Sequence, residues 1–253
     1  MEPSPALEPG RLEAWKKLKS LRSRPLDLGR LALIEERSLA ELADPAKLEA
    51  LIPELGLNDE GIEEIPEHLR PWCGQGLRIW QYPRQFSRYL AALAPRRISS
   101  YLEIGVRHGG TFVATVEILG RFHPIERAVG VDVIPCPSLV EYGRLSPRAE
   151  FLCLNSRSPE FVQALDRRGP FDLVLIDSLH EESHCRAEFE TVRSRAGIVA
   201  FHDIASARYP GVAKVWNEVK SLGEHDCLEF TDQYGGVGAS YMGLGVAIRK
   251  DRS

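Results

Sequence analysis

The residues best suited to chemistry are two aspartates that follow predicted strands. Asp177 comes directly after the apolar run FDLVLI, and Asp203 follows the run GIVAF and His202. If these strands are neighbours in a parallel sheet, their ends lie about 4.8 Å apart. Two carboxylates at that spacing repel each other unless a proton or a cation lies between them. The pattern therefore predicts a divalent metal held by Asp177 and Asp203.

Histidines accompany both aspartates. An imidazole ligand from His202 would favour manganese, iron or zinc over magnesium, which prefers oxygen ligands. Alternatively, His202 is not a ligand and carries a proton of the site. His180 opens the sequence HEESH, which fits the H-E-x-x-H pattern of zinc peptidases. That pattern needs two histidines one turn apart on a helix, whereas His180 is predicted to lie in the loop after a strand, so a peptidase is not favoured.

A glycine turn supplies a second candidate site. The segment YLEIGVRHGGT (residues 101–111) joins a predicted strand to a predicted helix, where open α/β sheets bind nucleotide-like cofactors. A dinucleotide fingerprint would need glycine at Arg107, so NAD and FAD fit poorly. Glu103 at the strand end and the glycines after it suit a cofactor without a pyrophosphate. Asp132 ends the next predicted strand, AVGVDV, and could accept hydrogen bonds from the two hydroxyls of a ribose.

These side chains need a sheet to position them. After residue 95, predicted strands and helices alternate, which favours a parallel sheet with right-handed crossovers. A third strand ends in Asn155 and Ser156, and residues 227–250 predict an antiparallel hairpin with a glycine-rich connection. Residues 1–95 differ in sequence pattern from the rest of the chain. Helical periodicity occurs in 11–21, 30–43 and 83–93, between several prolines. The charged run 61–70 indicates a solvent-facing helix.

The motifs in this order resemble the class I S-adenosylmethionine (SAM) dependent O-methyltransferases. The most similar group comprises cephalosporin-hydroxylase-like proteins and the metal-dependent macrolide-sugar and rhamnosyl O-methyltransferases, and the resemblance covers residues 81–250. It implies a Rossmann-like, seven-stranded, mostly parallel sheet with a closing antiparallel hairpin over residues 96–253. Residues 1–95 would form a helical extension, either a lid or an oligomer contact.

The resemblance also implies roles for individual residues. His180 matches the position of the catalytic base, acting with Asp177 on a hydroxyl of a small-molecule acceptor, a sugar or a natural product. Metal ligands would be Asp177, His202 and Asp203, holding Mg²⁺ or Mn²⁺, although the His202-Asp203 pair departs from the acidic or acid-amide pair of the metal-dependent members. The implied SAM-binding residues are Glu103, Gly105, Arg107, Gly109, Gly110, Thr111, Asp132, Asn155, Ser156 and Asp177.

Other functions and simpler roles stay open. The chain could be a catalytically inactive SAM-fold partner protein, or a metal-dependent hydrolase or oxygenase that uses the same histidines and aspartates. The glycines could serve packing alone, the strand-end acids could cap helices or form salt bridges, and His180 and His202 could be structural. Trp72, Trp80 and Tyr82 could line an acceptor pocket or belong to the core.

Composition narrows the class of protein. The 253 residues carry a net charge of −4, which argues against a nucleic-acid or membrane partner. The sequence shows neither a signal peptide at its start nor an apolar run near the roughly 18–20 residues of a membrane span, so we expect a cytoplasmic protein. Five cysteines without a C-x-x-C pair predict free thiols. The apolar helical extension makes a homo-oligomer plausible.

Overall fold

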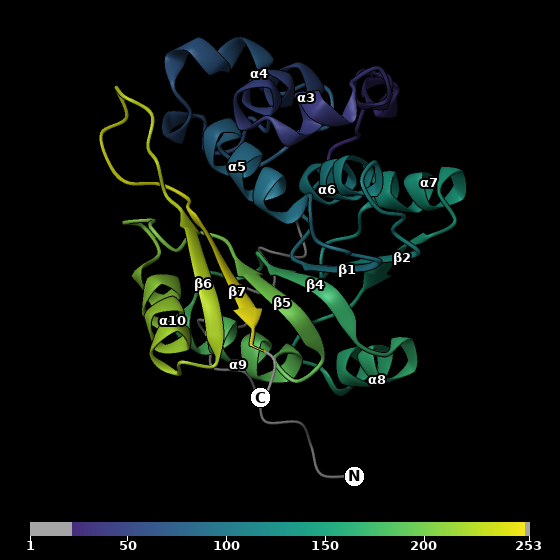
Figure 1. Ribbon diagram of the computed structural model, residues 1–253, viewed down its shortest axis with the longest axis vertical. Coiled ribbons are helices and arrows are strands. Elements are labelled where there is room, and N and C mark those ends of the chain that lie inside the picture. The colour runs from purple at the N-terminus through teal and green to yellow at the C-terminus, as the bar shows by residue number, and fades with distance from the viewer. Residues whose placement is uncertain (1–21, 251–253) are drawn as a thin grey trace.

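Seven strands form one sheet in the computed structural model, which describes residues 22–250. The strand order is β3-β2-β1-β4-β5-β7-β6, with β1 to β5 parallel and β7 antiparallel to both of its neighbours (Figure 1). This confirms the predicted Rossmann-like sheet with a closing hairpin. The strands are β1 (Ser100–Ile104), β2 (Arg127–Asp132), β3 (Ala149–Cys153), β4 (Phe171–Ile176), β5 (Ala196–Phe201), β6 (His225–Phe230) and β7 (Leu244–Arg249).

Helices cover both faces of the sheet. In Figure 1, α5, α6 and α7 lie on one face, with α3 and α4 stacked beyond them, and α8, α9 and α10 lie on the other. This arrangement follows from the alternation of strands and helices along the chain. The helices are α2 (Ala32–Glu35), α3 (Leu39–Ala43), α4 (Pro45–Leu55), α5 (Pro83–Leu93), α6 (Gly110–Gly120), α7 (Pro137–Leu145), α8 (Pro159–Arg168), α9 (Glu182–Val192) and α10 (Pro210–Ser221).

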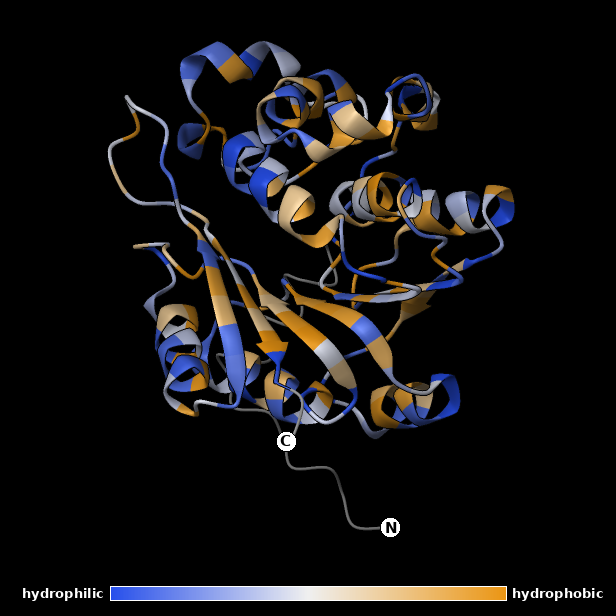
Figure 2. Cartoon of the chain, in the orientation of Figure 1, coloured by the Kyte–Doolittle hydropathy of each residue, from blue (hydrophilic) through white to orange (hydrophobic). Residues whose placement is uncertain are grey.

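Successive residues of the central strands enter two different cores. On β1, Tyr101 packs with the core beneath α4, α5 and α6, whereas Leu102 packs with the core beneath α8, α9 and α10. Leu173 and Val174 on β4 divide in the same way. Because side chains alternate between the faces of a strand, a strand buried on both faces is mostly apolar, as the largely orange β4 and β5 in Figure 2 show. This double burial holds the strand ends in fixed positions.

The helical extension differs in detail from its sequence pattern. Helical periodicity over residues 30–43 is broken because Ser38 caps α3, with its side chain accepting from the Glu41 N–H and the Glu41 side chain accepting from the Ser38 N–H. The charged run 61–70 was expected to form a solvent-facing helix, but it forms two short 3₁₀ turns, and Glu64 within it is buried. The helical pattern predicted for residues 11–21 lies outside the described residues.

The extension shares its core with the sheet. Leu48 and Leu51 of α4 and Phe86 of α5 belong to the same apolar cluster as Leu173 of β4 and Val246 of β7. The predicted domain boundary between residues 95 and 96 falls in the turn between α5 and β1. Residues before that boundary therefore help to fix the position of the sheet.

One glycine allows the extension to pass close to the start of α6. A Cβ at Gly110 would lie 1.8 Å from the carbonyl oxygen of Leu77. Because Gly110 does not have a positive φ, an alanine here would suffer from this contact and not from backbone strain. Gly110→Ala should therefore lower the free energy of unfolding by about 2 kcal/mol or more, measured by urea denaturation. Gly235→Ala, at a position with open space, should change it by less than about 0.5 kcal/mol. Equal effects of the two substitutions would contradict this contact.

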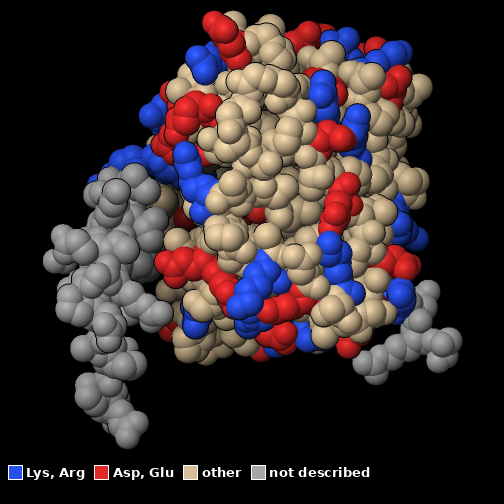
Figure 3. Space-filling model, turned by 90° about the vertical axis from the view of Figure 1, so that its left-hand side faces the viewer, with Lys and Arg blue, Asp and Glu red and all other residues tan. Residues whose placement is uncertain are grey.

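Three further features concern membrane-spanning helices, cysteines and surface charge. Within residues 22–250 no helix has the length and apolar character that crossing a membrane requires. All five cysteines are free thiols, as predicted. On the face shown in Figure 3, Lys and Arg side chains alternate with Asp and Glu side chains without forming a patch of one sign.

Candidate active site

A cavity of about 930 Å³ opens at the carboxyl ends of the parallel strands. Its lining includes all the residues predicted to act in catalysis or to bind cofactor or metal except Gly109 and Gly110. They are Glu103, Gly105, Arg107, Thr111, Asp132, Asn155, Ser156, Asp177, His180, His202 and Asp203. The sheet thus brings together side chains that lie up to a hundred residues apart in the sequence.

Backbone hydrogen bonds continue past the strands and fix the residues at their ends. The Gly105 N–H donates to Val131 O at 2.8 Å, the Asp177 N–H to Ile104 O at 2.8 Å, and the His202 N–H to Ile176 O at 3.1 Å. Asp203 follows with a φ of 62°, in the left-handed region that few aspartates adopt. A backbone held in such a conformation is common at functional sites.

All three predicted glycines are required by packing. A Cβ at Gly105 would lie 2.1 Å from the carbonyl oxygen of Asp177, so glycine here lets β1 and β4 run on side by side toward the cavity. Gly109 has a φ of 93°, and a Cβ there would meet Leu139. Gly109 and Gly110 therefore shape the turn into α6 without lining the cavity.

Asp132 is held by the backbone of the neighbouring loops. Its Oδ2 accepts from the Arg107 N–H at 2.8 Å, and its Oδ1 accepts from the Ile134 N–H at 2.9 Å. Burial raises the pKa of this carboxyl, and these backbone N–H groups oppose that rise. Each oxygen keeps a further lone pair for a ligand hydroxyl. The Arg107 side chain turns to the extension, with Nη2 2.6 Å from Glu60 Oε1 and Nε 3.0 Å from Oε2.

Glu103 lies deeper than the other acids. It is buried and accepts a hydrogen bond from the Tyr101 hydroxyl. Burial raises the pKa of Glu103 well above its usual range, which favours the neutral form of this carboxyl. A neutral acid can donate a hydrogen bond to a ligand, which an ionised one cannot.

Ser156 and Asn155 end β3 in different settings. Asn155 Oδ1 accepts from the Arg157 N–H at 2.9 Å, which closes a turn. Ser156 Oγ donates to the fully buried Glu188 and lies 3.2 Å from His184 Nε2. His184 Nε2 is also 3.1 Å from Glu188 Oε1, so one carboxylate orients both side chains at the cavity wall.

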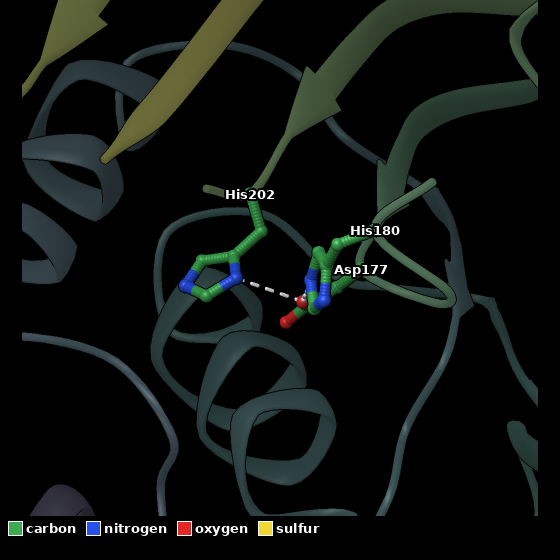
Figure 4. A group of neighbouring side chains, drawn as sticks. All are labelled: Asp177, His180 and His202. Carbon is green, nitrogen blue, oxygen red and sulfur yellow. Dashed lines mark hydrogen bonds and ion pairs between the residues drawn. The ribbon is translucent and has the colours of Figure 1, made fainter. Parts of the chain in front are cut away.

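The predicted metal and catalytic residues form one cluster. His202 Nδ1 lies 2.8 Å from Asp177 Oδ1, and His180 Nε2 lies 3.2 Å from the same oxygen (Figure 4). Asp203 Oδ2 is 3.2 Å from His180 Nε2 and 3.6 Å from His202 Nδ1. Exposure is 5% for the His202 side chain and 23% for that of His180, so His180 faces the open part of the cavity.

Charges in this cluster are strongly coupled. Burial alone would raise the pKa of Asp177, but His202 and His180 outweigh it and hold the pKa below its usual value. Burial alone would lower the pKa of His202, but Asp177 and Asp203 outweigh it and raise the pKa to about 9. Without a cation, a proton on His202 therefore balances the carboxylates, which agrees with the alternative that His202 carries a proton of the site.

The donor set also fits a divalent metal. One atom each from Asp177, His180 and His202 lie within 4.8 Å of one another. Although His202 Nδ1 is close to Asp177, neither of its ring nitrogens makes a hydrogen bond of acceptable geometry to the described residues. Imidazole and carboxylate donors suit borderline metals such as Mn²⁺, Fe²⁺ or Zn²⁺. His180 belongs to this compact group, whereas the sequence placed Asp203 in the metal set and His180 outside it.

The H-E-x-x-H pattern does not form a zinc-peptidase site. His180 lies in the loop after β4, and α9 begins only at Glu182. His180 contacts Asp177, whereas His184 contacts Ser156 and Glu188. The two histidines therefore contact different partners and are not placed to bind one zinc ion together.

Sequence reasoning missed several residues on the open side of the cluster. The Tyr209 ring stacks on His180, with centroids 4.5 Å apart. Arg208 Nη1 lies 2.6 Å from Oε1 of Glu64, a residue of the extension whose pKa is raised by burial. Met242 belongs to the same wall, together with Trp80, which was offered from the sequence as a possible pocket residue, whereas Tyr82 belongs to the core. No periodicity or motif marks these residues, because they reach the cavity from loops.

The comparisons with known proteins agree with this geometry. Residues 102–204 match the family described as a methyltransferase domain. No curated protein sequence matches the chain. The solved O-methyltransferase from Bacillus cereus, in complex with SAH, is 17% identical with a TM-score of 0.52, over 85% of this chain and 93% of that one. The O-methyltransferase TomG from Streptomyces achromogenes, involved in tomaymycin synthesis and in complex with SAM, is 18% identical with a TM-score of 0.50, over 68% of this chain and 82% of that one.

The matched segment runs from β1 to the residue after Asp203, so it contains the glycine turn and the strand-end acids. At these identities the solved structures support the fold, and the family match supports the activity class. Residues 102–204 therefore match a methyltransferase-domain family model, and the chain has the same Rossmann-like fold as these solved O-methyltransferases.

Proposed function

We propose that the protein is a SAM-dependent O-methyltransferase that methylates a hydroxyl of a small molecule, a sugar or a natural product, with the help of a divalent metal. The observation that carries the proposal is the single cavity that joins the β1 glycine turn and Asp132 to the cluster around Asp177. A volume of about 930 Å³ is at the upper end of the range for small-molecule pockets, which suits two ligands bound together. The solved O-methyltransferases with SAH or SAM support the choice of cofactor.

The cofactor half of the cavity would hold a nucleoside by its ribose. Asp132 presents a carboxylate whose orientation is fixed by two backbone N–H groups. Gly105 lets the chain pass without a side chain that would fill the turn. SAM would supply a methyl group on a sulfonium, and no pyrophosphate would need to be cradled.

The acceptor half would activate the hydroxyl. Asp177, His202 and Asp203 would hold the metal, and a divalent cation there would make a nearby hydroxyl more acidic. We assign His180 as the general base, since it is the most exposed member of the cluster and Tyr209 holds its ring by stacking. Because His180 Nε2 faces the two carboxylates, Nδ1 would take the hydroxyl proton as the oxygen bonds to the methyl carbon and the carbon–sulfur bond breaks, releasing SAH.

Positioning would supply much of the rate enhancement. Aligning two reactants in one site can lower a barrier by about 7–11 kcal/mol. The wall built from Trp80, Met242 and the Arg208–Glu64 pair would set the orientation of the acceptor. Its mixture of apolar and polar groups suits a decorated, uncharged acceptor.

A specific observation favours a second candidate function. The compact group Asp177, His180 and His202 is a two-histidine, one-carboxylate set, which non-haem iron oxygenases use. In that function His180 would be a ligand and could not act as the base.

One assay separates the two functions. The purified protein is incubated with SAM and a panel of sugar and natural-product hydroxyl acceptors, and SAH formation is measured with Mn²⁺ and after chelation. We expect acceptor-dependent SAH formation that needs the metal. Oxygen consumption with Fe²⁺ and no SAH would support the oxygenase instead.

The remaining expectations about the protein's setting are proposals of the same kind. We retain the expectations of a small-molecule acceptor and of no nucleic-acid or membrane partner, which rest on the net charge of −4. We retain the expectations of a cytoplasmic homo-oligomer, which size-exclusion chromatography with light scattering would test for the assembly.

A further inference from the structure

Gln81, a residue of the helical extension, reaches the metal cluster from outside the methyltransferase segment. Its side chain is 1% exposed, and its Nε2 donates a hydrogen bond to Asp177 Oδ2 at 3.2 Å. The opposite amide orientation would bring its oxygen against the carboxylate, so the nitrogen faces Asp177. Gln81 thus makes a contact that joins residues 96 positions apart.

The backbone around Gln81 is fixed. The Ile79 N–H donates to Gly56 O, and the Asn58 N–H donates to Ile79 O, both at 2.9 Å. Helix α5 begins at Pro83, two residues after Gln81, and Tyr82 between them is fully buried. A donor on so short and rigid a segment can fix the direction of the group that it contacts.

The two oxygens of Asp177 have separate partners. Oδ2 accepts from Gln81, whereas Oδ1 faces His202 Nδ1 at 2.8 Å and His180 Nε2 at 3.2 Å. A carboxylate with one oxygen engaged presents the other in a fixed direction. Hydrogen bonds of this kind set the orientation of metal ligands and commonly change metal affinity by 10- to 100-fold.

A second buried glutamine shows what a purely structural role looks like. Gln85 lies four residues later and is fully buried; its Oε1 accepts from the Gly243 N–H at 2.9 Å, and its Nε2 donates to Asp232 O at 3.1 Å. Gln81 Oε1, by contrast, is buried without a hydrogen-bond partner among the described residues. Leaving a buried amide oxygen unpaired is unfavourable, so packing alone does not explain Gln81.

We propose that Gln81 is a positioning residue that orients the Asp177 carboxylate for metal binding. The extension therefore completes the metal site, in addition to any role as a lid or an oligomer contact. This inference rests on the proposed metal-assisted function. It also gives the extension a role in metal binding, which comes from a residue outside the segment 102–204.

The test compares two substitutions of similar shape. Gln81→Met removes the donor but keeps an unbranched side chain of similar length, and Gln85→Met does the same one turn away. Mn²⁺ affinity is measured from the free-Mn²⁺ electron paramagnetic resonance signal, SAH affinity by calorimetry, and folding by thermal denaturation. We expect Gln81→Met to weaken Mn²⁺ binding by about tenfold or more and SAH binding by less than about twofold.

The control and the wild type separate the possible failures. Gln85→Met should lower the melting temperature without changing Mn²⁺ affinity, because its partners lie at Gly243 and Asp232. Unchanged Mn²⁺ affinity in Gln81→Met, with a wild type that binds Mn²⁺, would overturn this inference and leave the proposed function standing. A wild type that binds no divalent metal would overturn the metal-assisted function and the inference with it.

Discussion

Replacing Asp177 by asparagine is expected to lower the rate of methyl transfer by about 10³-fold, while SAH affinity changes by less than about threefold. Asparagine keeps the shape of the side chain but removes the charge that faces His202 and His180. Loss of a metal ligand removes several kcal/mol of stabilisation, and each 1.36 kcal/mol is about tenfold in rate. Steady-state kinetics with SAM and calorimetry with SAH measure the two quantities.

Two further variants give this prediction its controls. Asp172→Asn lies at the opposite end of β4, where Asp172 accepts from Ser99 and Ser100, so it should lower stability without affecting the rate in the folded enzyme. His180→Gln should lose about 10²–10⁴-fold in rate and keep its Mn²⁺ affinity if His180 is the base. Loss of Mn²⁺ affinity in His180→Gln would instead show that His180 is a metal ligand. For Asp177→Asn, equal losses of rate and of SAH affinity would contradict its assignment to the acceptor side of the cavity.

Asp132→Asn should weaken SAH binding by about 100-fold. A ribose that donates two hydrogen bonds to an ionised carboxylate gains about 1.5–3 kcal/mol from each, and asparagine cannot accept both. The substitution also places an amide N–H₂ against one of the two backbone N–H groups that orient Asp132. Calorimetric titration with SAH measures the loss, and circular dichroism checks that the protein is folded.

The matched control for Asp132 lies on the neighbouring strand. Glu150→Gln on β3 removes a carboxylate that pairs with Arg168 at the surface, nearer the start of the strand, and should leave SAH affinity unchanged. A surface pair of this kind contributes little to stability. Unaltered SAH affinity in Asp132→Asn would show that the ribose lies elsewhere in the cavity.

The sequence predicted the elements of the sheet because burial on both faces leaves a clear apolar pattern. Strands β1, β2, β4 and β5 were expected from such runs, and β3, also expected, is only partly buried. The acids and histidines at the strand ends meet because parallel strands end at one edge. The extension was harder to interpret. Glu64 was assigned to a solvent-facing run, but the chain turns it inward toward Arg208, and local pattern cannot reveal a partner 144 residues away.

The contacts of the candidate site that sequence reasoning missed come from loops and from the extension. Gln81 and Tyr209 each lie beside a helix start, and nothing in their local sequence distinguishes them from core or surface residues. Their proximity to Asp177 and His180 depends on how the extension and the loop before α10 fold over the sheet edge. The predicted glycines illustrate the converse case: their positions were clear from sequence, but their role in packing required the structure.

The most direct test of the methyltransferase assignment is a calorimetric titration of the purified protein with SAH, in the presence of Mn²⁺ and again after chelation. We predict roughly micromolar binding under both conditions, because the Arg107 and Ile134 N–H groups orient Asp132 without any contact to the proposed metal ligands. That result would establish the cofactor and place the metal on the acceptor side. Absence of SAH binding under both conditions would contradict the assignment and leave the two-histidine, one-carboxylate cluster as the centre of a different reaction.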